Sequence, residues 1–362
     1  MMIHIGMDQH KQFTVAAALN PETGEVIERR LEHDDPDAIT AFLKSFDDEV
    51  CVTLETTGNW YWLADVIEAA GARVRLCHTV EAKRRRRGRA KNDRLDAIGL
   101  AELSAEDRVP ESYVPVRDER DRRERHRFRI RLVRIQTVLK NWIRSLLAKL
   151  NIAVPFEDAF GKGGRAFLDA LDLRDPYGGH LRRTLRILDG LAAEIEREGG
   201  AIRATLKTDD RAAILLSAPG VGELTAYLML HEIGPIERFP GPKQFAKYCC
   251  VTPGTEESAG RRGRPGVGRA GNLYLKAAFT SAVNGAVKKD AAIRTYHNRQ
   301  VRHNGKKKAK VATAHKLARA VYFMLTRRQA YRPARSAKRH VTRKTLAKKT
   351  TAGKPVLRLG RP

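Results

Sequence analysis

The chain has 362 residues, of which 42% are hydrophobic, so we expect two or three domains, each with its own core. Lys and Arg outnumber Asp and Glu by 69 to 42, a formal net charge of +27, which favours a polyanionic partner such as a nucleic acid. No apolar run is long enough to cross a membrane and no two cysteines form a C-x-x-C pair, so we expect no membrane partner, no disulfide and no zinc site in a reduced, cytoplasmic protein.

Residues 1–112 alternate strand and helix patterns. The expected elements, in chain order, are strands at 3–7, 13–19 and 26–31, a helix at 37–46, a strand at 50–54, a helix at 60–70 and a strand at 74–77. The Pro21-Glu22-Thr23-Gly24 turn predicts that the second and third strands form a hairpin. This order predicts an α/β domain with a mixed sheet.

The rest of the chain is predicted to be mainly helical. Apolar residues recur at spacings of three and four in two parts of residues 113–206, separated by a Gly-, Pro- and Asp-rich loop at 155–179. We expect two long helices forming an antiparallel pair or a coiled-coil arm, with an ordinary helical bundle as the alternative. Residues 207–330 form a Gly-punctuated helical domain. The basic tail, 331–362, contains no acid and is predicted to be disordered.

Four carboxylates are placed where strands and a helix could gather them. Asp8 and Glu55 each follow an apolar strand pattern, and Asp93 and Asp96 share one face of the next expected helix. Taken singly, each acid is more simply a surface or capping residue. Together they would repel one another unless metal ions bound them. We therefore predict a site for two Mg²⁺ ions, with Mn²⁺ as the alternative, of the kind that cleaves phosphodiesters.

Basic residues precede the two aspartates. The predicted phosphate-positioning set in this stretch is Lys83, Arg84, Arg85, Arg86, Arg87 and Lys91. A solvated charged face is the simpler alternative. His10 is more simply a structural residue than a metal ligand, but it lies two residues after Asp8 and stays open as a further candidate for the site.

Three segments now carry a resemblance to a known family. The stretches Ile5 to Lys11, Leu54 to Gly58 and Lys91 to Ala97 resemble the DEDD transposases of the insertion-sequence one-ten family, also called the Piv/MooV recombinases. The resemblance implies a RuvC-like N-terminal domain with the RNase H fold. It also implies that the four carboxylates named above form a metal-binding tetrad.

The C-terminal domain contains two Gly-rich motifs. Gly220 and Gly222 form a Pro-Gly-x-Gly turn before a predicted helix, similar to a helix-hairpin-helix element that could hold a phosphate. An ordinary interhelical turn is an equal alternative. Further along, Ser258 precedes an Arg/Gly loop, whose predicted nucleic-acid-binding residues are Arg261, Arg262, Arg264 and Arg269. Arginines stabilise charge on a reacting phosphate, although a lone serine is more often a turn hydroxyl.

The stretch 214–280 resembles the second conserved domain of the same family. The likeness implies that Ser258 attacks DNA and forms a covalent protein–DNA link, although this chain has Ser258-Ala259-Gly260 where the family usually has Ser-Gly. It further implies a bacterial or archaeal enzyme of insertion-sequence transposition, which acts by DNA strand exchange under the guidance of a noncoding bridge RNA. A dimer or tetramer would assemble across donor and target DNA.

Three other functions remain open at this stage. A Piv-like site-specific invertase would share the chemistry but act at fixed sites. A structure-selective nuclease of the Holliday-junction type would leave hydrolysed ends, with Ser258 merely structural. A protein that only binds nucleic acid would need none of the carboxylates for its function.

Overall fold

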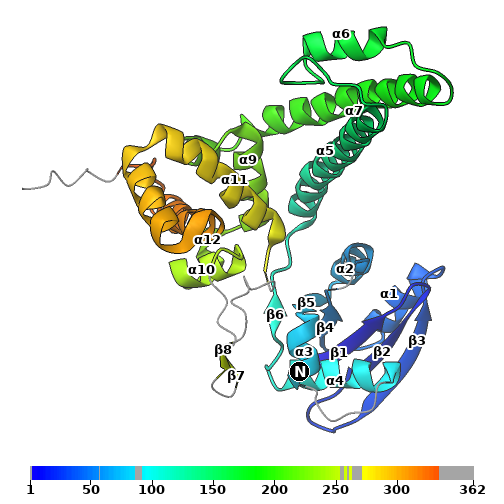
Figure 1. The fold of residues 1–362 in the computed structure, drawn as a ribbon. Coiled ribbons are helices and arrows are strands. Elements are labelled where there is room, and N and C mark those ends of the chain that lie inside the picture. Colours follow the sequence, from blue (N-terminus) through cyan, green and yellow to red (C-terminus); the bar gives the residue numbers. More distant parts are fainter. Residues whose placement is uncertain are drawn as a thin grey trace, which may run out of the picture. The chain divides into compact units, whose positions relative to one another are not determined.

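The structure, a computed structural model, describes residues 2–56, 58–85, 92–252, 257–258, 261–262 and 271–333. The contacts divide the chain into two compact units, unit 1 from Met1 to Asp121 and unit 2 from Arg122 to Pro362 (Figure 1). Each unit is described by itself. No helix among the described residues is long and apolar enough to cross a membrane.

Unit 1 contains a six-stranded mixed sheet in the order β3-β2-β1-β4-β5-β6. Its strands are β1 (Met2–Gln9), β2 (Phe13–Leu19), β3 (Val26–Glu32), β4 (Glu49–Glu55), β5 (Arg73–Cys77) and β6 (Glu111–Ser112). The first three are antiparallel, whereas β4 runs parallel to both β1 and β5. The predicted mixed α/β domain is confirmed, and this strand order is consistent with an RNase H-like fold. The short antiparallel strand β6 was not predicted.

Helices of unit 1 cover both faces of the sheet, and the alternation of side chains along β1 shows which helices lie on which face. Ile3, Ile5 and Met7 of β1 belong to a core with residues of α1 (Pro36–Lys44) and α2 (Trp60–Ala69). Gly6 lies between them in the sequence and therefore faces the opposite side, where α4 (Asp93–Ala105) packs. A further helix, α3 (Thr79–Arg85), follows β5.

Two long helices begin the rest of the chain. They are α5 (Arg117–Lys149) and α7 (Tyr177–Leu206). They run antiparallel, because Leu146 near the end of α5 shares a core with Leu185 near the start of α7, while Arg125 pairs with Glu198 at 3.7 Å near their other ends. A coiled-coil arm itself remains a prediction. The loop expected at 155–179 was only partly right, since it includes a helix, α6 (Lys162–Ala170), that contributes Leu168 to the same core.

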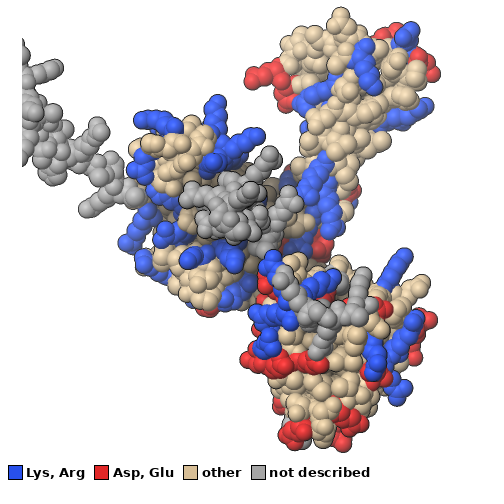
Figure 2. Space-filling model, turned by 60° about the horizontal axis from the view of Figure 1, so that its bottom comes forward, with Lys and Arg blue, Asp and Glu red and all other residues tan. Residues whose placement is uncertain are grey.

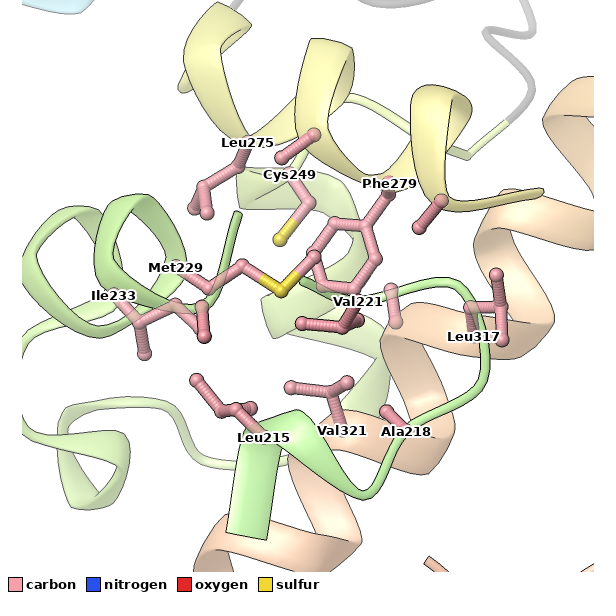
Figure 3. Packing of buried hydrophobic residues seen from close by; sticks show 14 of the residues in the cluster. Leu215, Ala218, Val221, Met229, Ile233, Cys249, Leu275, Phe279, Leu317 and Val321 are labelled. Carbon is pink, nitrogen blue, oxygen red and sulfur yellow. The ribbon is translucent and has the colours of Figure 1, made fainter. Parts of the chain in front are cut away.

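The remaining helices of unit 2 surround one apolar core. They are α8 (Arg211–Leu216), α9 (Glu223–Ile233), the 3-10 helix η1 (Ile236–Arg238), α10 (Pro242–Tyr248), α11 (Leu273–Lys289) and α12 (Ala291–Thr326). Met229, Cys249 and Phe279 meet at its centre (Figure 3). All four cysteines of the chain are buried, and none is joined to another in a disulfide. Between residues 252 and 271 the structure describes only the paired strands β7 (Glu257–Ser258) and β8 (Arg261–Arg262).

Candidate active site

Two predicted site carboxylates lie at the carboxyl ends of neighbouring parallel strands. The register pairs Met7 of β1 with Leu54 of β4, so Asp8 and Glu55 occupy the next position on each strand. Residues paired in this way point to the same face of a sheet. Asp8 also shares a face with Gly6, two residues earlier, and that face is covered by α4. Both carboxylates are therefore placed on the α4 face of the sheet.

The close approach of α4 depends on Gly6. A Cβ atom built at Gly6 would lie 1.9 Å from the carbonyl oxygen of Ala97 and 2.6 Å from the amide nitrogen of Ala101. Only a residue without a side chain permits that contact. It sets the first turn of α4, which carries Asp93 and Asp96, over the end of β1. The helix is capped by Asn92, whose side chain accepts a hydrogen bond from the amide of Arg94 at 3.0 Å, so the alternative that Asp93 is the capping residue is wrong.

Asp8 and Asp93 meet around His10. The Nε2 atom of His10 lies 3.2 Å from an Oδ2 atom of each carboxylate. One ligand atom from each of the three residues lies within 4.8 Å of the other two, close enough for all three to bind the same metal ion. Glu55 and Asp96 lie outside this trio. Oxygen ligands suit Mg²⁺ and Mn²⁺, and an imidazole is a better ligand for Mn²⁺ than for Mg²⁺. The residues present therefore fit a divalent ion.

His10 is fixed in place by its neighbours. Its ring stacks on Phe13 with the centroids 4.6 Å apart. Its backbone carbonyl accepts a hydrogen bond from Asn59 Nδ2 at 3.2 Å, while the Asn59 carbonyl accepts one from Gln9 at 3.1 Å. The histidine thus sits on a braced turn between β1 and β2. Only its spacing from Asp8 in the sequence pointed to this position.

The basic run before α4 is described in part. Lys83, Arg84 and Arg85 form the last turn of α3. Arg84 pairs with Glu81 at 2.9 Å, and Arg85 donates to the carbonyl of Arg108. The other predicted members of the run, Arg86, Arg87 and Lys91, lie outside the described residues. Contact of this run with phosphate remains a prediction.

The Gly220 turn has a packing role that the sequence did not indicate. Gly220 has φ 83°, and a Cβ built there would lie 2.0 Å from the carbonyl oxygen of Ala282 in α11. Gly222, by contrast, is exposed, precedes α9 as its N-cap and has open space around it. The turn thus joins α8 to α9 while pressing against α11. A helix-hairpin-helix role in phosphate binding remains a prediction.

Ser258 lies in a short β-ribbon of unit 2, where it pairs with Arg261. Two other predicted residues of this segment, Arg264 and Arg269, lie outside the described part of the chain. The segment is closed at its base, because the amide of Asn272 donates to the carbonyl of Tyr248 at 2.7 Å. Gly271 makes this closure possible, since a Cβ there would lie 2.5 Å from the same carbonyl oxygen.

A buried carboxylate supports the base of this segment. Glu232 of α9 is fully buried and accepts hydrogen bonds from His126 at 3.1 Å, from Arg127 at 2.8 and 2.9 Å, and from Asn272 Nδ2 at 2.6 Å. Burial raises the pKa of Glu232, but the hydrogen bonds from His126 and Arg127 outweigh it and lower the pKa to about 2. Three helices, α5, α9 and α11, therefore meet at one ionised side chain. Sequence reasoning missed this network.

Comparisons with known proteins match both parts of the chain. A family model of DEDD transposases of the IS110 type matches residues 5–152, and the model of the transposase IS116/IS110/IS902 family matches residues 212–298. A "Probable family 20 transposase" from Pseudomonas aeruginosa is 28% identical over 299 residues, covering 78% of this chain and 86% of the relative. The transposase for insertion sequence element IS1111A from Coxiella burnetii is 27% identical over 261 residues, covering 67% of this chain and 68% of the relative.

The carboxylate face of unit 1 and the two family matches, in one strongly basic chain, define an enzyme that cleaves and transfers DNA strands. The first match spans all four predicted carboxylates, and the second spans Ser258. The chain belongs to the DEDD transposases of the IS110 family. Membership of this family implies that the enzyme binds DNA and uses a divalent metal ion.

Proposed function

We propose that the protein moves an insertion sequence by cutting DNA with Ser258 as the nucleophile and exchanging the strands. The observation that carries this proposal is the convergence of Asp8 and Asp93 around one point on the α4 face. The proposed metal-binding residues are Asp8, Glu55, Asp93 and Asp96, which would hold two Mg²⁺ or Mn²⁺ ions. When bound, these ions would stabilise negative charge on the reacting phosphate.

The covalent step requires one bond to form and one to break. The Oγ atom of Ser258 attacks the phosphorus of the scissile phosphodiester and loses its proton. The bond from that phosphorus to a sugar oxygen breaks, and the departing oxygen takes up a proton. Arginines of the same segment, among them Arg261 and Arg262, would neutralise charge on the phosphate. The phosphoserine bond conserves the energy of the broken phosphodiester, so a second DNA end can displace the serine and complete strand exchange.

We further propose that the active enzyme is a dimer or tetramer guided by a noncoding bridge RNA. The carboxylates belong to unit 1 and the serine to unit 2, so the reactive groups of one site can come from two protomers. The net charge of +27 is compatible with binding RNA and two DNA duplexes together. Flanking inverted repeats beside a fixed invertible segment would instead favour the site-specific invertase.

Recombination in cells tests the proposal. The gene is supplied with its native flanking DNA as the wild type, as Asp8→Ala and as Ser258→Ala, with equal accumulation of the three proteins checked by immunoblot. Loss of recombination in both variants supports the two-site mechanism, and RNA that co-purifies with the wild type is then sequenced. If Ser258→Ala still recombines, the serine mechanism is wrong. If cleaved DNA with hydrolysed ends persists in Ser258→Ala, the structure-selective nuclease replaces the proposal. If Asp8→Ala remains active, the carboxylate site is wrong.

A further inference from the structure

Helix α12 is a hairpin of two helices. Gly305 has φ 74° and ψ 164°, which are not helical values. In one straight helix, residues 16 apart would be separated by about 24 Å. Yet His297 Nδ1 lies 2.9 Å from Thr313 Oγ1, and Lys316 Nζ lies 4.6 Å from the ring centroid of Tyr296. The two arms, residues 291–304 and 306–326, therefore fold back on each other at Gly305.

The tip of this hairpin is exposed and basic. All seven residues from Arg302 to Lys308 are exposed, and the sequence there is Arg-His-Asn-Gly-Lys-Lys-Lys. Below the tip, Ala309 and Thr313 are fully buried, so the arms pack together and present the tip to solvent. Figure 2 shows Lys and Arg side chains spread over the visible face of the α10–α12 part of unit 2, with few acidic ones. We call residues 302–308 the basic tip.

The charge of the basic tip is uncompensated within the described part of the chain. The sequence contains no Asp or Glu after Asp290, and no described carboxylate forms an ion pair with Lys306, Lys307 or Lys308. These three lysines also occupy the first turn of the second arm, where the helix dipole disfavours cations. Lys306 and Lys310 add a like-charge pair at i, i+4. These unfavourable charge interactions lower the stability of the free protein. A bound polyanion would relieve them by neutralising the lysines.

We propose that the basic tip binds the phosphodiester backbone of a nucleic acid. This inference rests on the proposed function and deepens it, because it names one nucleic-acid contact that a transposase needs. The tip contains no Phe, Tyr or Trp on which a base could stack and no apolar residue to enter a membrane. Its lysines are point charges that neutralise phosphates without reading sequence. Asn304 and His303 add donors of hydrogen bonds at the same place. The basic tip lies beyond residue 298, where the family match ends.

Salt dependence of binding tests the proposal with the full chain. The combined variant Lys306→Gln, Lys307→Gln, Lys308→Gln is compared with wild type by fluorescence anisotropy, using duplex DNA in one arm and a structured RNA in the other. Chelator is present throughout, so the result does not depend on strand cleavage or on Ser258. Three phosphate contacts contribute about 2.7 to the slope of log affinity against log salt on duplex DNA. We expect the slope to fall by about that amount, and the Lys→Arg triple variant to retain it.

A control variant removes the same charge elsewhere. Arg29→Gln, Lys44→Gln and Arg73→Gln lie on separate exposed positions of unit 1 and should leave the slope within error of wild type. Loss of slope with DNA alone, RNA alone or both supports the tip as a backbone site and identifies the nucleic acid it takes. An unchanged slope with both nucleic acids would overturn the proposal. So would an equal fall in the control, because net charge and not the tip would then be responsible. Helix content measured by circular dichroism should not fall in the tip variant, since the removed cations opposed the helix dipole.

Discussion

Replacing Glu232 with Gln should destabilise unit 2 at neutral pH. The substitution keeps the shape of the side chain but removes the negative charge that accepts hydrogen bonds from His126, Arg127 and Asn272. Arg123 and Arg127 are then left largely buried, with 7% and 19% of their side chains exposed, without the carboxylate that offsets their charge. Removing one partner of such a buried network costs about 3–5 kcal/mol.

The lowered pKa of Glu232 gives a second value for the stability that this carboxylate contributes. The pKa of Glu232 falls from its ordinary value of 4.5 to about 2 in the folded protein, which corresponds to about 3 kcal/mol of stability. Because the folded pKa is below the unfolded one, this contribution is present above pH 4.5 and is lost as the pH falls toward 2. Wild type should therefore lose more stability across that window than Glu232→Gln, which lacks the titrating group.

Urea unfolding and hydrogen exchange measure these effects. At neutral pH, exchange of amides in α9 should be faster in Glu232→Gln by a factor that corresponds to about 3 kcal/mol, while peptides from β1 and β4 in unit 1 should not change. Glu237→Gln, an exposed neighbour on η1, serves as the matched control and should stay within about 0.5 kcal/mol of wild type. Equal protection of α9 in Glu232→Gln and Glu237→Gln would refute the reasoning, as would parallel acid titrations of wild type and Glu232→Gln.

Three further predictions concern unit 1. Asp96→Asn should abolish strand cleavage and leave DNA affinity unchanged; full activity would remove Asp96 from the proposed metal site. Gly6→Ala should cost about 1–3 kcal/mol, because its Cβ would force α4 away from the sheet, whereas Gly190→Ala, with open space around it, should not lower the urea midpoint. His10→Ala should weaken Mn²⁺ binding, measured by calorimetry, by about tenfold or more, and unaltered Mn²⁺ affinity would show that His10 neither binds nor positions the ion.

Much of unit 1 could be predicted because its signals are local. Apolar runs bounded by turns predicted the strands. Asp8 and Glu55, which follow two of those runs, lie at the carboxyl ends of neighbouring strands in the structure. The sequence could not indicate how closely α4 approaches β1. That distance depends on Gly6 meeting Ala97 and Ala101, and a single glycine inside a strand has no distinctive pattern.

The parts that were missed depend on residues far apart in the sequence. Glu232 gathers donors from positions 126, 127 and 272, and no periodicity predicts such a meeting. The reversal of α12 was hidden for a related reason. Gly305 stands in an otherwise continuous helical pattern, and the contacts of the folded chain, such as that between His297 and Thr313, reveal that the chain turns back.

The most direct test of the two-site mechanism is to look for protein joined covalently to DNA. Purified wild type, Asp8→Asn and Ser258→Ala are incubated with the element's end DNA, its co-purified RNA and Mg²⁺ or Mn²⁺, then denatured, digested and analysed by mass spectrometry. The mechanism predicts a nucleotide attached to the peptide that contains Ser258 in wild type and no adduct in either variant. DNA cut by wild type without any adduct, or an adduct that persists in Ser258→Ala, would contradict it.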